Sequence, residues 1–197
     1  MSTFLLTSSQ TVGPFFSPCL LREDARRNVL TGPETLGERI RIEGRVLDGD
    51  GAPVPDALVE IWQADAHGRY NHRADQVPAP LAPDFIGFGR SGTEDDGSYW
   101  FETIRPGPVP FSAQQWQAPH ICVTVFARGL LNHLVTRLYF ADEPANAGDP
   151  VLQYVPNERR STLLARRDAR LPGHSDMAVY RFDIILQGAG ETVFFNL

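Results

Sequence analysis

Short runs of alternating apolar and polar residues constrain the fold of this chain most strongly. In "APHICVTV" (118–125), one side of an extended chain carries Ile121, Val123 and Val125. The other side carries His120 and Cys122. A period of two predicts a half-buried β-strand whose apolar face turns toward a core. Further segments with strand-like patterns are residues 39–48, 57–63, 97–104, 136–140, 179–186 and 191–195.

Turn signals separate these segments. The chain holds 17 glycines and 16 prolines, and phrases such as "DGDGAPVP" and "EDDG" predict tight turns. Many short strands with little helix between them predict an all-β fold, an antiparallel β-sandwich or barrel. Only residues 157–168 show a weak helical pattern, and such a helix would cover a sheet edge.

The first part of the chain differs from the rest. Residues 1–36 contain Pro, Gly and Ser and show no strand pattern, so we predict an N-terminal arm that packs on a partner chain. Residues 37–197 form the predicted β-sandwich domain. A hydrophobic content of 42% in 197 residues suits one globular domain.

Composition also excludes several classes of function. The net charge of -6, with no basic stripe to offset it, argues against nucleic acid as a partner. No apolar run approaches the length that crosses a membrane, and the N-terminus lacks the basic region of a signal peptide. Cys19 and Cys122 cannot form a disulfide framework, so we expect reduced thiols and a cytoplasmic protein.

One pair of side chains has the spacing of metal ligands. His120 and Cys122 share a face of one predicted strand, roughly 6.5–7 Å apart. A histidine and a thiolate together favour zinc or copper, whereas a lone strand histidine is more often a hydrogen-bonded structural residue. No CxxC motif or second nearby cysteine completes a site. The residues alone therefore leave open whether this strand holds a metal.

Longer phrases carry more information. "GRVLDGDGAPVPDALVEIWQADAHGRYNH", "GFGRSGTEDDGSYWFETIRPGPVP" and "WQAPHICVTVFARG" follow one another, and "SQTVGPFF" (9–16) precedes them. Together they resemble the intradiol ring-cleavage dioxygenases, from about residue 39 through the C-terminal "GETVFF". The resemblance implies a β-sandwich in which two tyrosines and two histidines hold a ferric ion, Fe(3+), that makes a bound catechol reactive toward O2.

The family's ligand phrases can be compared with this chain one at a time. The first tyrosine ligand lies in "GRY", which matches Tyr70. The second lies in "KPGPYPW", but this chain has "RPGPVPF", which places Val109 there. The two histidines lie in "RPAHIH", where this chain has "QAPHIC": His120 matches the first, and Cys122 replaces the second. The arginine before that motif, which neighbours the substrate, is Gln117 here.

Two of the four ligand positions have therefore lost their ligand. Valine offers no lone pair, and one phenolate with an imidazole and a thiolate is not the set that stabilises ferric iron. The chain resembles the α subunit of family members built from two homologous subunits, of which only β binds the iron. The resemblance thus implies no metal ligand and no catalytic residue in this chain, a hetero-oligomer with a β subunit, and a vestigial metal site at Tyr70, Val109, His120 and Cys122.

The resemblance also assigns substrate-binding residues. In the family, a "TxGP" arm of α reaches the active-site mouth of the partner, matching Thr11, Gly13 and Pro14, and the arginine of "FARG" lines the same site, matching Arg128. The substrate is a catechol with a carboxylate, to which an arginine offers charge-assisted contacts. Without the resemblance, Arg128 would be interpreted as part of a surface salt bridge. We interpret Arg137, in "TRLYF", as a structural residue.

Two alternatives remain at this point. The first is a self-sufficient intradiol dioxygenase with an altered metal set such as Tyr70, His120 and Cys122. The second is a non-catalytic β-sandwich binding module without a partner. The metal content of the isolated chain tests the first alternative, and a neighbouring gene that encodes "RPAHIH" would argue against the second.

Overall fold

The computed structural model describes residues 10–13, 16–22, 27–80, 82–168 and 177–196, which form a mostly β fold with few helices. The helical segments are α1 (Phe16–Leu20), η1 (Pro144–Gly148), α2 (Pro150–Tyr154) and η2 (Asn157–Leu163). The strands are β1 (Arg39–Leu47), β2 (Leu58–Trp62), β3 (Phe88–Gly92), β4 (Ser98–Ile104), β5 (Val109–Ser112), β6 (Gln115–Gln117), β7 (His120–Phe126), β8 (Leu134–Phe140), β9 (Leu164–Arg167), β10 (Ala178–Arg181) and β11 (Ile184–Ile185).

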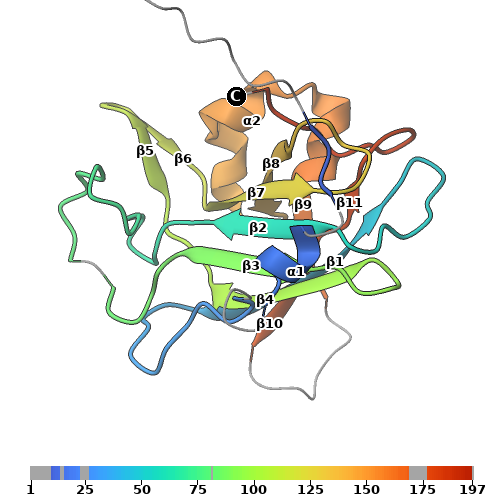
Figure 1. Ribbon diagram of the computed structural model, residues 1–197. Helices are drawn as coiled ribbons and strands as arrows, with labels where there is room; N and C mark the ends of the chain where they lie inside the picture. The colour runs from blue at the N-terminus through green and yellow to red at the C-terminus, as the bar shows by residue number, and fades with distance from the viewer. Residues whose placement is uncertain (1–9, 14–15, 23–26, 81, 169–176, 197) are drawn as a thin grey trace, which may run out of the picture.

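Nine strands form one sheet, and β5 and β6 form a separate hairpin beside it (Figure 1). The order is β11-β1-β10-β9-β8-β7-β2-β3, with β4 paired to β1. The pairs β1–β10, β1–β11 and β8–β9 are parallel, and the other pairs are antiparallel. The predicted mostly β fold is confirmed, but the sheet is mixed and not wholly antiparallel.

A segment before β1 joins the two ends of this sheet. Arg27 forms an antiparallel bridge with Arg90 of β3, and Val29 forms a parallel bridge with Glu102 of β4. Residues 27–30 therefore act as a short strand between β3 and β4, and the sheet is nearly closed around its interior. These residues lie inside the predicted arm, yet they pair with the chain's own sheet.

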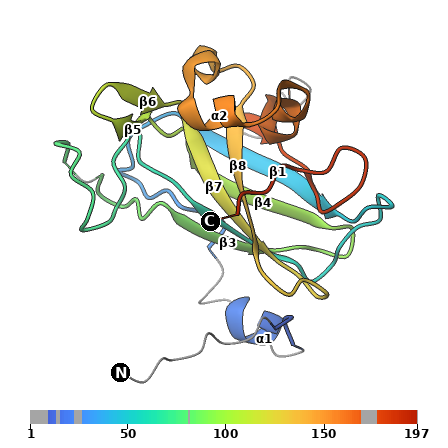
Figure 2. The same ribbon diagram turned by 90° about the horizontal axis from the view of Figure 1, so that it is seen from above.

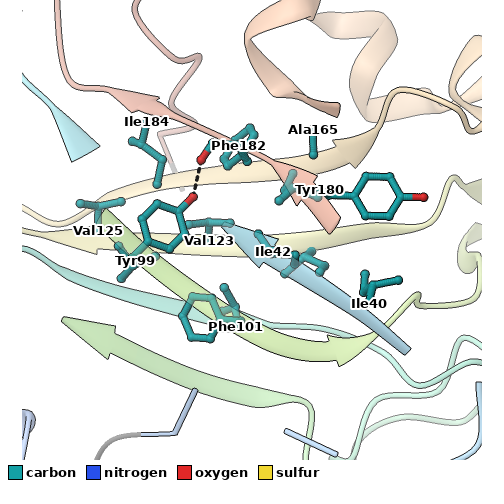
Figure 3. Packing of buried hydrophobic residues seen from close by; sticks show 14 of the residues in the cluster. Ile40, Ile42, Tyr99, Phe101, Val123, Val125, Ala165, Tyr180, Phe182 and Ile184 are labelled. Atoms are coloured by element: carbon teal, nitrogen blue, oxygen red, sulfur yellow. Dashed lines mark hydrogen bonds between the residues drawn. The ribbon is translucent and has the colours of Figure 1, made fainter. Parts of the chain in front are cut away.

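The core fills the inside of this curved sheet. Inward-facing residues of β1, β4, β7 and β10 meet there, as the alternating patterns predict (Figure 3). The Tyr99 hydroxyl on β4 donates a 2.6 Å hydrogen bond to the carbonyl oxygen of Phe182. That carbonyl lies so close to Gly44 that an added Cβ would stand 1.8 Å from it. The predicted strand 179–186 is accordingly interrupted at residues 182 and 183 and becomes β10 and β11.

Two predicted elements differ from the structure. Residues 191–195 make no strand, only an isolated bridge from Phe195 to Val135. The helix predicted at 157–168 is a 3-10 helix as far as Leu163 and then the strand β9. Because β9 pairs with β8 on one side and β10 on the other, sheet pairing outweighs the local helical pattern.

The short helix α2 lies beside the start of β7. The carboxylate of Asp149 caps α2 by accepting the Leu152 N–H at 2.7 Å, and it also accepts the Ala118 N–H at 2.7 Å. This one carboxylate therefore connects α2 to the residues that lead into β7. Figure 2 shows that α2 and α1 lie on opposite sides of the molecule. None of the helices in the described part of the chain is long and apolar enough to span a membrane.

Candidate functional site

A tight loop positions Tyr70. The carboxylate of Asp65 accepts two backbone N–H groups of this loop at 2.8 and 3.0 Å. Gly68 has φ +78° and approaches Pro108 so closely that an added Cβ would lie 2.0 Å from the Pro108 carbonyl oxygen. The loop therefore packs directly against the segment that leads into β5. The Tyr70 ring stacks on Trp62 of β2, with the centroids 5.7 Å apart.

Strand register brings the other ligand positions toward this ring. Val109 begins β5 and pairs with Gln117 of β6. Cys122 lies on β7 opposite Trp62 of β2, the residue that stacks on Tyr70. His120 begins the same strand, and its Nδ1 lies 2.7 Å from the carbonyl oxygen of Ala118. The structure thus places the four residues of the vestigial metal site around one end of β7.

A cation from β8 lies among them. Arg137 pairs with Cys122 across the sheet, and its Nη1 donates hydrogen bonds to Oε1 of Gln117 at 2.6 Å and to the Tyr139 hydroxyl at 3.4 Å. Its charge also acts on Tyr70 and His120. The sequence analysis interpreted Arg137 as structural and missed this position. The available signal was the lone charge in "LVTRLYF", but only the register between β7 and β8 places that charge opposite Cys122.

The neighbours of this guanidinium are uncharged at neutral pH. Burial raises the pKa of the Tyr70 phenol and of the Cys122 thiol, although Arg137 opposes both shifts. Burial, aided by the charge of Arg137, lowers the pKa of His120 to about 4. The site therefore holds a phenol, a thiol and a neutral imidazole beside one fixed positive charge.

This arrangement does not fit a ferric ion. Val109 supplies no donor atom, the sulfur of Cys122 is a softer ligand than ferric iron prefers, and the guanidinium of Arg137 opposite Cys122 repels a second cation. Within the described ranges, no three His, Cys, Asp or Glu side chains gather into a group that could hold a metal ion.

A cavity of about 490 Å³ opens beside these residues. The Tyr70 loop forms one wall and the β5–β6 hairpin forms the other. The lining includes Tyr70, Val109, Trp116 and Gln117, together with Gly68, Ala74, Asp75, Gln76, Val77, Pro78 and Pro110. Its walls are largely apolar, and Trp116 remains 57% exposed.

The predicted substrate-binding residues lie elsewhere. The Thr11 hydroxyl accepts a 2.9 Å hydrogen bond from the Gly129 N–H, so the N-terminal segment meets the residue after Arg128. Arg128 forms a 3.4 Å ion pair with Asp56, and both side chains are largely exposed, at 69% and 60%. Gly13 is exposed, and no atom within 4 Å requires a glycine there. Pro14 lies outside the described residues.

The segment after Gly13 packs on the chain's own sheet. The ring of Phe16 lies 5.8 Å from that of Phe126, the last residue of β7, and Leu21 contacts Gly92 of β3. These contacts hold α1 near the end of β7 that leads to Arg128.

The two candidate regions lie at opposite ends of one strand. β7 runs from His120 to Phe126, which spans roughly 20 Å at about 3.3 Å per residue. Arg128 follows the far end of this strand. It is therefore too far away to contact a ligand held between Tyr70 and His120 of the same chain.

Comparison of the sequence with known proteins identifies a family. The sequence model of a dioxygenase family matches residues 12–188. The chain belongs to the intradiol ring-cleavage dioxygenases. Among intradiol dioxygenases, it is 44% identical to the protocatechuate 3,4-dioxygenase alpha chain of Burkholderia cepacia, with both chains fully covered. It is 43% identical to the alpha chain from Pseudomonas putida over 96% of each chain. The family membership predicted from the sequence is confirmed.

The chain is also similar to a second type of chain. The beta chain of protocatechuate 3,4-dioxygenase from Burkholderia cepacia is 43% identical over 87% of this chain and 74% of its own length. Among solved structures, the dioxygenase domain of a fusion protein from Streptomyces sp. SirexAA-E has a TM-score of 0.62 and 28% identity, covering 91% of this chain and 97% of that domain. Catechol 1,2-dioxygenase from Pseudomonas arvilla C-1 shares the fold, with a TM-score of 0.64 and 22% identity over 81% of this chain and 55% of that chain.

Proposed function

We propose that this chain is the α subunit of a protocatechuate 3,4-dioxygenase. In an αβ hetero-oligomer it contributes to the cleavage of protocatechuate by O2 to 3-carboxy-cis,cis-muconate in aromatic catabolism. Its similarity to alpha chains over the whole length supports this assignment. The single observation that carries it is the vestigial metal site, where Val109 and Arg137 stand among the ligand positions.

Iron belongs to the partner in this proposal. The ferric ion, held by the β subunit, makes the catechol reactive toward dioxygen. Tyr70, His120 and Cys122 of this chain hold no metal in this proposal, since Val109 leaves the fourth ligand position without a donor and the charge of Arg137 opposes a metal cation. The same two features count against a self-sufficient dioxygenase built on these three residues. The whole-length similarity to chains of a two-chain enzyme counts against an isolated binding module.

The N-terminal arm and Arg128 complete the partner's site. In this proposal residues 1–36 form the arm, which reaches the mouth of the β site. Thr11 bonds to Gly129, which fixes the arm beside Arg128 before the partner binds. Gly13 lets the backbone approach the substrate closely, and Pro14 stiffens the arm. We assign the complex to the cytoplasm.

Arg128 has the properties of a substrate contact. Its side chain is 69% exposed, and among the described residues its ion-pair partner is the exposed carboxylate of Asp56. Such a pair contributes roughly 0–1 kcal/mol, so a substrate carboxylate at a desolvated interface displaces it at little cost. The guanidinium then forms charge-assisted hydrogen bonds with the carboxylate of protocatechuate.

Steady-state kinetics of the αβ complex test this role. Arg128→Ala should lower kcat/KM for protocatechuate roughly tenfold to a hundredfold, because a charged hydrogen bond is lost, mainly through KM. Catechol, which lacks the carboxylate, should lose much less, and the iron content should not change. Asp56→Asn is the matched control, since it removes the ion pair and keeps the guanidinium. Equal losses for both substrates, or no loss for either, would show that Arg128 does not contact the substrate.

A further inference from the structure

A hydrogen bond joins two segments that we assign to the shared site. The Gly129 N–H, one residue after Arg128, donates to the Thr11 hydroxyl at 2.9 Å, and both residues are exposed. A hydrogen bond between exposed neutral groups stabilises less than the ordering of two backbone residues costs. Thr11 therefore stays beside Arg128 only if further contacts hold the N-terminal segment in place.

Phe16 supplies one of these contacts. Its N–H donates to the Gly13 carbonyl oxygen at 3.0 Å, so the start of α1 is connected to residues 11–13. Its half-buried ring lies 5.8 Å from the ring of Phe126, at an interplanar angle of 46°. Aromatic pairs at such distances stabilise a contact beyond the burial of their apolar surface. The N-terminal segment is thus attached to the last residue of β7, two positions before Arg128.

Phe126 also contacts the other end of the connection that carries Arg128. His133 directly precedes β8, and its ring lies 5.5 Å from the ring of Phe126. Residues 127–133 connect β7 to β8, so this contact joins the two ends of the connection. Phe16, Phe126 and His133 therefore form one aromatic cluster, which lies at the base of the connection that carries Arg128.

A second contact holds the other side of α1. An added Cβ at Gly92 of β3 would stand 2.5 Å from Cδ1 of Leu21, so the glycine leaves the space that this side chain fills. Further along the chain, Arg27 pairs with Arg90 of the same strand. The N-terminal segment is therefore attached on both sides of α1, to β7 through Phe16 and to β3 through Leu21.

We propose that Phe126 is a positioning residue, which acts through this aromatic cluster to hold Thr11 beside Arg128 before the partner chain binds. This role rests on the proposed function, in which the arm and Arg128 complete the partner's site, and it adds a residue that acts only through the arm. A segment that is ordered in advance loses less conformational entropy when a complex forms. The aromatic cluster therefore strengthens substrate binding without taking part in the reaction.

Nuclear magnetic resonance of the isolated full-length chain tests the aromatic cluster independently of the proposed function. In the wild type, the backbone amides of α1 should have order parameters of about 0.85, and in Phe126→Ala these should fall below about 0.6. Exchange of the Gly129 N–H with solvent should become at least about threefold faster in this variant, because Thr11 no longer stays beside it. Phe126→Tyr keeps the ring and should retain both wild-type properties.

Two further variants separate release of the arm from a folding defect. Phe16→Ala removes the other ring of the pair and leaves every strand unchanged, so it should release α1 in the same way. Phe111→Ala is the matched control, since it removes an exposed phenylalanine from the β5–β6 hairpin, which precedes the opposite end of β7. Rigid α1 amides in both Phe16→Ala and Phe126→Ala would overturn the proposal.

Steady-state kinetics of the purified αβ complex test the effect on binding. Phe16→Ala and Phe126→Ala should each raise KM for protocatechuate roughly threefold to tenfold, with kcat and iron content unchanged. Phe126→Tyr and Phe111→Ala should keep the wild-type KM. A lower kcat with an unchanged KM would overturn the positioning role. Released α1 with unchanged kinetics would support the aromatic cluster as the attachment of the arm and would contradict the proposed role of the arm in the partner's site.

Discussion

Nη1 of Arg137 lies 2.6 Å from Oε1 of Gln117, and this hydrogen bond joins two residues from different strands at the vestigial metal site. The family resemblance implies that Gln117 occupies the position where iron-binding chains have an arginine beside the substrate. In this chain the positive charge comes instead from β8, directly opposite Cys122. A guanidinium therefore supplies a positive charge among the residues at the family's ligand positions.

This relationship predicts how the metal site can be restored. Val109→Tyr with Cys122→His rebuilds the four ligand types but keeps the guanidinium, so the double variant should bind ferric iron only weakly. Adding Arg137→Gln removes the repulsion and should tighten binding at least about tenfold. Iron titration followed by the visible absorption of tyrosinate-bound ferric iron measures both. If the triple variant binds no better than the double variant, Arg137 does not oppose the metal.

The buried imidazole of His120 makes stability depend on pH. Burial lowers its pKa from 6.5 to about 4, so between these values the unfolded chain binds a proton that the folded chain does not. The stabilising effect is complete above pH 6.5 and is lost as the pH falls toward 4. Between pH 6.5 and pH 5 the loss should be on the order of 2 kcal/mol.

Denaturant unfolding at several pH values measures this loss. His120→Gln should flatten the dependence over this range, whereas His133→Gln, at an exposed histidine, should retain it. A wild-type slope in His120→Gln would mean that other groups cause the pH dependence.

Only a glycine at position 44 leaves room for the connection between β10 and β11. A methyl group there would stand 1.8 Å from the Phe182 carbonyl oxygen, which also accepts the Tyr99 hydrogen bond. Gly44→Ala should therefore destabilise the fold by about 1–3 kcal/mol or more. Gly148→Ala is the control, because no atom lies within 4 Å of its added methyl group, and its effect should stay within about 0.5 kcal/mol. Equal melting temperatures for the two variants would contradict this account.

Strand patterns predicted much of the sheet. The runs at 39–48, 57–63, 97–104 and 118–125 correspond to β1, β2, β4 and β7, because each has a buried face with a period of two. Strand β9 was not predicted, since "LARR" becomes a strand only by pairing with β8 and β10. Such non-local pairing leaves little trace in the local sequence.

Only part of the candidate site could be predicted from the sequence, because the rest depends on non-local pairing. Motifs carry Tyr70, Val109, His120 and Cys122, so these residues could be named from the sequence, and their role stays a prediction. Arg137 was missed, since its place depends on the register between β7 and β8, which puts it opposite Cys122. The contact of Thr11 with Gly129 likewise joins segments 118 residues apart.

Iron analysis of the separated and assembled chains tests the central claim most directly. The full-length chain is purified alone and together with its β partner, and bound iron is measured per chain by plasma mass spectrometry. We predict essentially no iron in the isolated chain, and one ferric ion per αβ pair with ring-cleavage activity in the complex. Stoichiometric iron in the isolated chain, or unchanged iron and activity in β when this chain is absent, would contradict the account.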